Sequence, residues 1–143
     1  MKLKIVILCV VLKLHLSSAF SSGAGTSACE TMTPQHGSNE PQTSEAPFTF
    51  SLSSQNVGQG ETMTITIESE NDFGFRGFMI QARGLTEASE VVGRFEFIDG
   101  SRSVLCGDLP PNSVATHSSS ALKTRLQLTW QAPTDFIGII NFQ

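Results

Sequence analysis

Six short segments after residue 47 carry the hydrophobic pattern of β-strands. Apolar side chains alternate with polar or small ones in four of them: residues 48–52, 63–67, 126–130 and 136–142. The other two candidates, residues 78–82 and 94–98, are both bounded by glycine. Period-two alternation predicts half-buried strands, and Gly58 and Gly60 supply a turn between the first two.

The spacing of these segments predicts an all-β fold. No segment has a convincing helical period, and Leu85–Val92 is compatible with a single helical turn that is too short to change the class. Short strands separated by turn signals are typical of an antiparallel β-sandwich, and an immunoglobulin-like arrangement is favoured. Ten Phe, one Trp and no Tyr supply core bulk without hydroxyl groups that need hydrogen-bond partners.

The chain begins with the pattern of a secretory signal peptide. A basic start precedes the unbroken apolar run Ile5–Leu12, and small residues at Ser17 and Ala19 match a cleavage site. A membrane anchor is the alternative, but the run is far shorter than the ~20 apolar residues that a bilayer requires. We predict a signal peptide over residues 1–19, cleavage between Ala19 and Phe20, and a secreted protein.

Residues 20–45 differ in composition from the rest of the chain. They are rich in Ser, Thr, Gly and Pro and have few apolar side chains, so they bury too little surface to offset their ordering entropy. We predict an extended or loop-like segment that Cys29 tethers to the domain. The remaining length suits one domain with one core.

Loss of the signal peptide makes the protein acidic. Three of the nine basic residues leave with residues 1–19 and all thirteen acids stay, so six basic residues face thirteen acids and the formal charge falls from −4 to −7. Such a chain has no basic patch that could release counterions from a phosphate backbone. We therefore expect no nucleic-acid partner, no insertion into membranes and no lytic mechanism.

Two cysteines remain in the mature chain, because Cys9 lies within the signal run. In an oxidising compartment, a disulfide between Cys29 and Cys106 is the default for a chain with two cysteines. Two free thiols or an intermolecular bridge are the alternatives.

Five motifs and the second cysteine occur in the order expected for the reeler (reelin N-terminal) domain family, which the chain resembles. Residues 29–37 resemble the opening pattern Cys-x-x-Met-x-Pro-x-His-Gly, and residues 130–133 resemble a Trp-x-Ala-Pro turn. The remaining matches are residues 75–83, Cys106, residues 115–118 and residues 138–142.

The resemblance implies an extracellular immunoglobulin-like sandwich over residues 29–143, with Cys29 and Cys106 as its bridging pair. Family members continue beyond the strand in which Gln143 ends, so the domain is expected to lack its final strand. Reeler domains occur in reelin, in spondins, in ferric-chelate reductase-like membrane proteins and alone in small secreted defence proteins of invertebrates. The chain looks most like the last group.

No residue pattern predicts catalysis, a metal site or a cofactor. His36 and His117, with the two mature cysteines, lack the ligand spacing of a zinc site, and the serines after His117 lack a Gly-x-Ser-x-Gly motif. Arg76 and Arg83 flank an aromatic strand and are candidate surface-binding residues for an anionic or sugar ligand. The alternative is that both are rim charges that cover the sheet.

These observations favour a secreted, non-enzymatic humoral defence protein. Its expected partner is a microbial surface or an extracellular host protein. The alternative is the N-terminal reeler domain of a larger extracellular-matrix or ferric-chelate reductase-like protein with an adhesion or interaction role. An enzyme is the third class, and no candidate catalytic set supports it.

Overall fold

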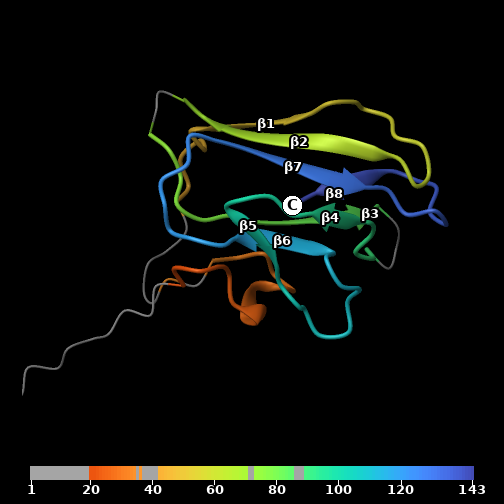
Figure 1. Cartoon of the computed structure of the whole chain (residues 1–143), viewed down its shortest axis with the longest axis horizontal. Coiled ribbons are helices and arrows are strands. Elements are labelled where there is room, and N and C mark those ends of the chain that lie inside the picture. Colours follow the sequence, from red (N-terminus) through yellow and green to blue (C-terminus); the bar gives the residue numbers. More distant parts are fainter. Residues whose placement is uncertain (1–19, 35, 37–41, 71–72, 86–88) are drawn as a thin grey trace, which may run out of the picture.

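The computed structural model describes residues 20–34, 36, 42–70, 73–85 and 89–143. All named strands pair antiparallel in two four-stranded sheets, ordered β1-β2-β7-β4 and β5-β6-β3-β8, which form the two layers of a sandwich (Figure 1). The elements of the described residues are η1 (Thr26–Ala28), β1 (Phe48–Leu52), β2 (Thr62–Ser69), β3 (Met79–Gly84), β4 (Arg94–Glu96), β5 (Ser101–Ser103), β6 (Val114–His117), β7 (Arg125–Gln131) and β8 (Ile140–Phe142). The predicted all-β sandwich is confirmed.

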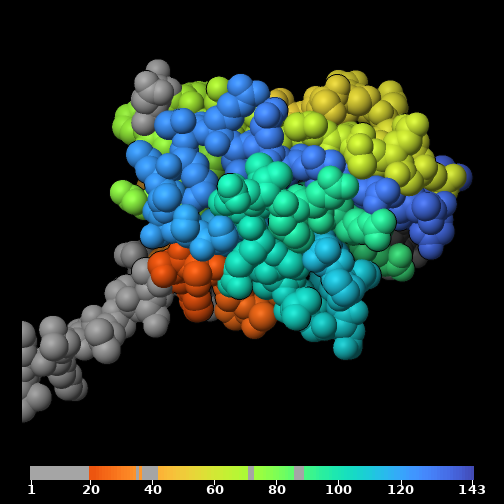
Figure 2. Space-filling model, in the orientation of Figure 1, coloured from red at the N-terminus to blue at the C-terminus, as the bar shows by residue number. Residues whose placement is uncertain are grey.

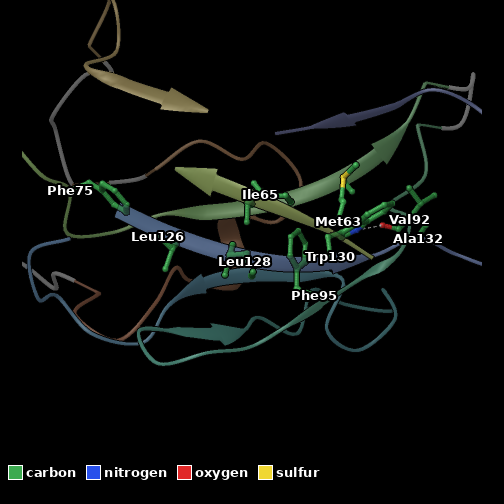
Figure 3. Close-up of a cluster of buried hydrophobic side chains, with 12 residues drawn as sticks. Met63, Ile65, Phe75, Val92, Phe95, Leu126, Leu128, Trp130 and Ala132 are labelled. Carbon is green, nitrogen blue, oxygen red and sulfur yellow. Dashed lines mark hydrogen bonds between the residues drawn. The ribbon is translucent and has the colours of Figure 1, made fainter. Parts of the chain in front are cut away.

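The main core lies between the two sheets and is centred on strands β2 and β7. Their register places Met63 opposite Trp130 and Ile65 opposite Leu128, and all four side chains are buried. Alternation of apolar and polar residues along both strands therefore directs one face of each inward. Trp130 donates its indole N–H to the carbonyl oxygen of Val92 at 3.3 Å, so the ring is held in position by a hydrogen bond as well as by packing (Figure 3).

The second sheet is buried on both faces along β6. Ala115 belongs to the main core, whereas Val114 packs with Val104 and Cys106 in a second apolar cluster. Successive side chains of a strand point to opposite faces, so this second cluster lies on the outer face of the sheet. The N-terminal segment, orange in Figure 1, runs along β6 on the side away from the first sheet.

Strand β1 is less buried than its alternating pattern predicts. All five of its residues are exposed, and Phe50 retains 47% of its accessible surface. The cause is its place at the edge of the first sheet, where it pairs only with β2. Aromatic contacts from Phe48 to Phe75 and from Phe50 to Phe142 shield only part of its apolar face.

The strands differ in extent from their predicted ranges, and two were missed. The segments predicted at 94–98 and 136–142 are strand only over β4 and β8, and the missed strands are β5 and β6. In the region predicted as a helical turn, residues 86–88 lie outside the described residues. Its described part is not helical, because Val91 bridges Arg83 and the amide of Val92 donates to the carbonyl oxygen of Ala82.

Candidate functional site

The N-terminal segment, residues 20–34, is bonded to the outer face of the second sheet. The disulfide expected between the two mature cysteines is present, with 5.7 Å between the Cα atoms of Cys29 and Cys106. The short helix η1 directly precedes Cys29, and its Ala28 is buried. Outside η1, residues 20–34 form no helix or strand, and the sheet supplies burial and hydrogen bonds that this segment cannot provide for itself.

Side chains of β6 bind the backbone of this segment. The hydroxyl of Thr116 accepts from the amide of Ala24 at 2.9 Å and donates to the carbonyl oxygen of Phe78 at 2.6 Å. His117 Nδ1 accepts from the amide of Phe78, so the neutral ring carries its proton on Nε2, which donates to the carbonyl oxygen of Phe20 at 3.0 Å. Both ring nitrogens therefore have partners, and the segment is connected to the sheet at two points besides the disulfide.

A cavity of about 450 Å³ lies between this segment and the second sheet. Most of its lining is apolar, and Figure 2 shows the segment, in orange, lying against the body of the domain. His117 and Gly77 form the floor of the cavity, on the side of the second sheet. The ring can pack against Gly77 because a Cβ atom at this position would lie only 2.9 Å from Cε1 of His117. The residues that line the cavity are Phe20, Ser21, Ala24, Gly25, Ser27, Ala28, Met32, Pro34, His36, Arg76, Gly77, Phe78, Met79, His117 and Ser120.

Two basic residues lie close together here: Arg76 lines the cavity, and Lys123 lies beside Arg76. The exposed Arg76 donates from one guanidinium nitrogen to the carbonyl oxygen of Ser120 at 3.0 Å. Lys123 donates from Nζ to the carbonyl oxygens of Arg76, Ser119 and Ala121. Burial and the nearby charge of Arg76 lower the pKa of Lys123. These carbonyl partners carry no negative charge that would neutralise the two cations.

Arg83, the other arginine predicted to bind at the surface, has a different environment. It is half-buried on β3 and donates to the carbonyl oxygen of Ser89 at 2.9 Å. The side-chain amide of the fully buried Gln81 is oriented with its oxygen toward Arg83. That oxygen accepts hydrogen bonds from Arg83 Nε at 2.9 Å and from Arg83 Nη2 at 3.1 Å. The structure therefore places Arg76 at the cavity, whereas Arg83 satisfies a buried amide on the same strand.

Catalytic or metal-binding groups do not converge in the described residues. No group of three or more His, Cys, Asp or Glu side chains there could hold a metal ion. His36 and His117 both line the cavity, but the sulfurs of Cys29 and Cys106 are bonded to each other. The ring nitrogens of His117 contact backbone and Thr116 rather than a serine that could act as a nucleophile.

A second cavity, of about 470 Å³, opens between the β1–β2 connection and the segment that leads into β8. Its lining is more evenly polar and apolar, and Trp130 and Met63 contribute to it. Ile137 and Ile139 lie beside it and are 88% and 71% exposed. No concentration of charge marks this cavity, which distinguishes it from the first.

Several motif residues named from the sequence line the first cavity, among them Met32, His36 and His117, but nothing in the sequence predicted that they enclose a cavity. Phe20 was noted only as the expected N-terminus, and Ala24 and Phe78 contribute main-chain groups that no sequence motif reveals. One sequence feature could have indicated that this sheet is covered on its outer face. Val114–His117 is a run near a cysteine that has no charge and no alternation. Such a run is typical of a strand that is covered on both faces.

In the part of the chain that the structure describes, no helix is long and apolar enough to cross a membrane. The predicted signal peptide, residues 1–19, lies outside the described residues, and so does the Ala19 side of the predicted cleavage site. Secretion therefore stays a prediction from the sequence.

Two curated relatives show the range of proteins that resemble this chain. "Putative defense protein 3" of Antheraea mylitta is 36% identical over 139 residues, which cover 95% of this chain and 81% of that protein. "Putative ferric-chelate reductase 1 homolog" of Drosophila melanogaster is 36% identical over 124 residues, but these cover 84% of this chain and only 19% of that protein. The chain therefore corresponds to about a fifth of the reductase homolog.

Solved structures share the fold. The human F-spondin reeler domain (fragment 2) superposes with a TM-score of 0.56 at 21% identity, covering 68% of this chain and 76% of that one. A second structure, the Reelin-N domain of F-spondin, gives 0.57. Residues 27–143 match the family described as Reeler domain, and this chain belongs to that family.

Proposed function

We propose that the mature chain is a secreted, non-enzymatic protein of humoral defence that recognises microbial surfaces. One observation carries this proposal. In the defence-named relative from Antheraea mylitta, the matching region makes up 81% of the protein, whereas it makes up 19% of the reductase homolog. The relatives in which this domain is nearly the whole protein are thus named for defence, including one from Bombyx mori of which 79% is covered.

The charge of the chain limits how such a protein can act. After the predicted cleavage, six basic residues face thirteen acids. An acidic sandwich lacks a cationic amphipathic segment that could insert into an anionic bilayer. Binding without lysis is therefore the mode that this charge favours, and it depends on specific contacts rather than on bulk attraction.

A pull-down on whole bacteria in physiological salt tests recognition. At about 0.15 M salt the Debye length is about 8 Å, so nonspecific attraction is largely screened and specific contacts persist. We expect the protein to sediment with the cells more than an acidic secreted domain of similar size does, with no release of cytoplasmic contents. The transcript should also rise after bacterial challenge. Equal retention of both proteins, together with no induction, would contradict the proposal.

A second function is favoured by the reductase matches. The chain is similar to one domain of a much longer protein in Drosophila melanogaster, and to "Putative ferric-chelate reductase 1" of Danio rerio at 33% identity over 22% of its length. In this case the domain would serve adhesion or spacing within a larger protein. Sequencing the transcript past Gln143 distinguishes the two, because a continuing reading frame with membrane spans would favour the larger protein.

A further inference from the structure

The first cavity has the size of a small-molecule site. Pockets that bind small ligands have volumes of about 300–1,000 Å³ and are mainly apolar with few polar groups. This cavity, of about 450 Å³, lies within that range, and Phe20, Met32, Phe78 and Met79 supply its apolar lining. Its two walls come from different parts of the chain, the N-terminal segment and the β3–β6 region, which the disulfide holds together.

The floor of the cavity offers little polar chemistry to a ligand. His117, which is 9% exposed, already bonds through both nitrogens to main-chain groups of Phe20 and Phe78. A ligand that required a polar partner at this depth would have to break one of those bonds. The interior therefore suits a hydrocarbon chain or ring.

The rim of the cavity has the free hydrogen-bond donors and the positive charge that its floor lacks. Arg76 lines the cavity and is exposed, and its guanidinium keeps donors beyond the one that bonds Ser120. Lys123 lies next to Arg76 and adds to the local positive charge in a chain that is otherwise acidic. In the described residues, the hydrogen bonds of these two cations go to neutral carbonyl groups. An anionic group at the rim would meet guanidinium donors and positive charge that these carbonyl hydrogen bonds do not neutralise.

We propose that this cavity binds a monomeric anionic amphiphile, with its hydrocarbon part between the N-terminal segment and β3 and its carboxylate at Arg76. A medium-chain fatty acid has this chemistry. The site is a property of the fold and does not depend on the proposed role in defence, so either can fail without the other.

Titration with sodium decanoate, below its micellar concentration, tests the site, and 1-decanol serves as the uncharged counterpart. We expect saturable binding of decanoate that is about tenfold tighter than that of the alcohol, as a charge-assisted hydrogen bond would give. Arg76→Gln should abolish this difference and leave the affinity for the alcohol unchanged. Arg125→Gln, which removes an exposed arginine from β7 on the other sheet, is the matched control and should retain the difference.

Methionine methyl NMR locates the bound ligand. Three methionines remain in the mature chain: Met32 and Met79 line this cavity, whereas Met63 lies in the main core and lines the second cavity. Decanoate should shift the methyl signals of Met32 and Met79 and leave that of Met63 in place. An unchanged Met63 signal in the Arg76→Gln protein also verifies that the variant is folded.

Several results would overturn the proposal. They are the absence of saturable decanoate binding, equal affinities for acid and alcohol, a shift confined to Met63, and equal effects of the two arginine substitutions. Sedimentation with phosphatidylglycerol vesicles in the absence of free decanoate binding would assign the surface to a bilayer and also overturn the proposal.

Discussion

Replacing Gly93 by alanine should be strongly destabilising because this glycine contacts the centre of the core. Its φ of +69° lies in the left-handed region, which costs an alanine about 1 kcal/mol. A Cβ atom would also lie 2.3 Å from Cζ2 of Trp130 and 2.5 Å from the carbonyl oxygen of Gln131. Neither neighbour can move easily, since Trp130 is fully buried and Gln131 belongs to the same strand, β7.

The expected loss of stability has two parts besides the backbone cost: overpacking against the indole ring of Trp130 and loss of the ring's hydrogen bond. Overpacking costs about 1–3 kcal/mol. Loss of the hydrogen bond to Val92 would leave a buried N–H without a partner, at about 1–3 kcal/mol more. With the backbone cost, Gly93→Ala should lower the free energy of unfolding by at least about 3 kcal/mol. This is a large part of the 5–15 kcal/mol that is typical of a domain.

Gly107→Ala is the matched control. Gly107 also has a positive φ, of +56°, but nothing lies within 4 Å of its added Cβ, so only the backbone cost of about 1 kcal/mol applies. The chain has a single tryptophan, so urea unfolding followed by Trp130 fluorescence reports directly on the affected site. If the two variants unfolded at the same urea concentration, the steric reasoning about Gly93 would be refuted.

Three further outcomes can be measured. Replacing Cys29 and Cys106 by alanine should lower the free energy of unfolding by about 4–5 kcal/mol on the chain-entropy model for a separation of 77 residues, and a loss below 1 kcal/mol in urea unfolding would contradict it. Mass spectrometry of the secreted protein should show an N-terminus at Phe20, and material that retains the apolar run would disprove the signal peptide. Arg83→Gln should destabilise the fold by about 1–3 kcal/mol because buried Gln81 loses its partner, whereas a surface-binding role alone would leave the unfolding midpoint unchanged.

Strands β2 and β7 were predicted correctly because one face of each lies in the main core and the other does not. In β2 and β7, alternate residues such as Ile65 and Leu128 point inward, and their neighbours are exposed or half-buried. The alternation of apolar and polar residues in the sequence therefore matches the alternation of burial along the strand. Strand β1 has the same pattern and yet stays exposed, because alternation reveals which face is apolar and not whether another layer covers it. Burial at a sheet edge depends on neighbours that are distant in the sequence.

Strands β5 and β6 were not predicted, for two different physical reasons. β6 is buried on both faces, so Val114 and Ala115 are both apolar and no alternation marks the strand. β5 has three residues, Ser101–Ser103, and its polar composition resembles that of a turn. Both strands pair through their backbones with neighbouring strands, and composition does not record this pairing.

The first cavity could not be predicted from the sequence for a related reason. Its wall is a segment with few apolar side chains, and the sequence alone predicts that such a segment gains too little from burial to become ordered. In the structure, its order comes from the bond between Cys29 and Cys106 and from hydrogen bonds that Thr116 and His117 make to its backbone. Each of these partners lies more than 70 residues away in the chain. The cavity therefore depends for one wall on the disulfide together with these hydrogen bonds between distant parts of the chain.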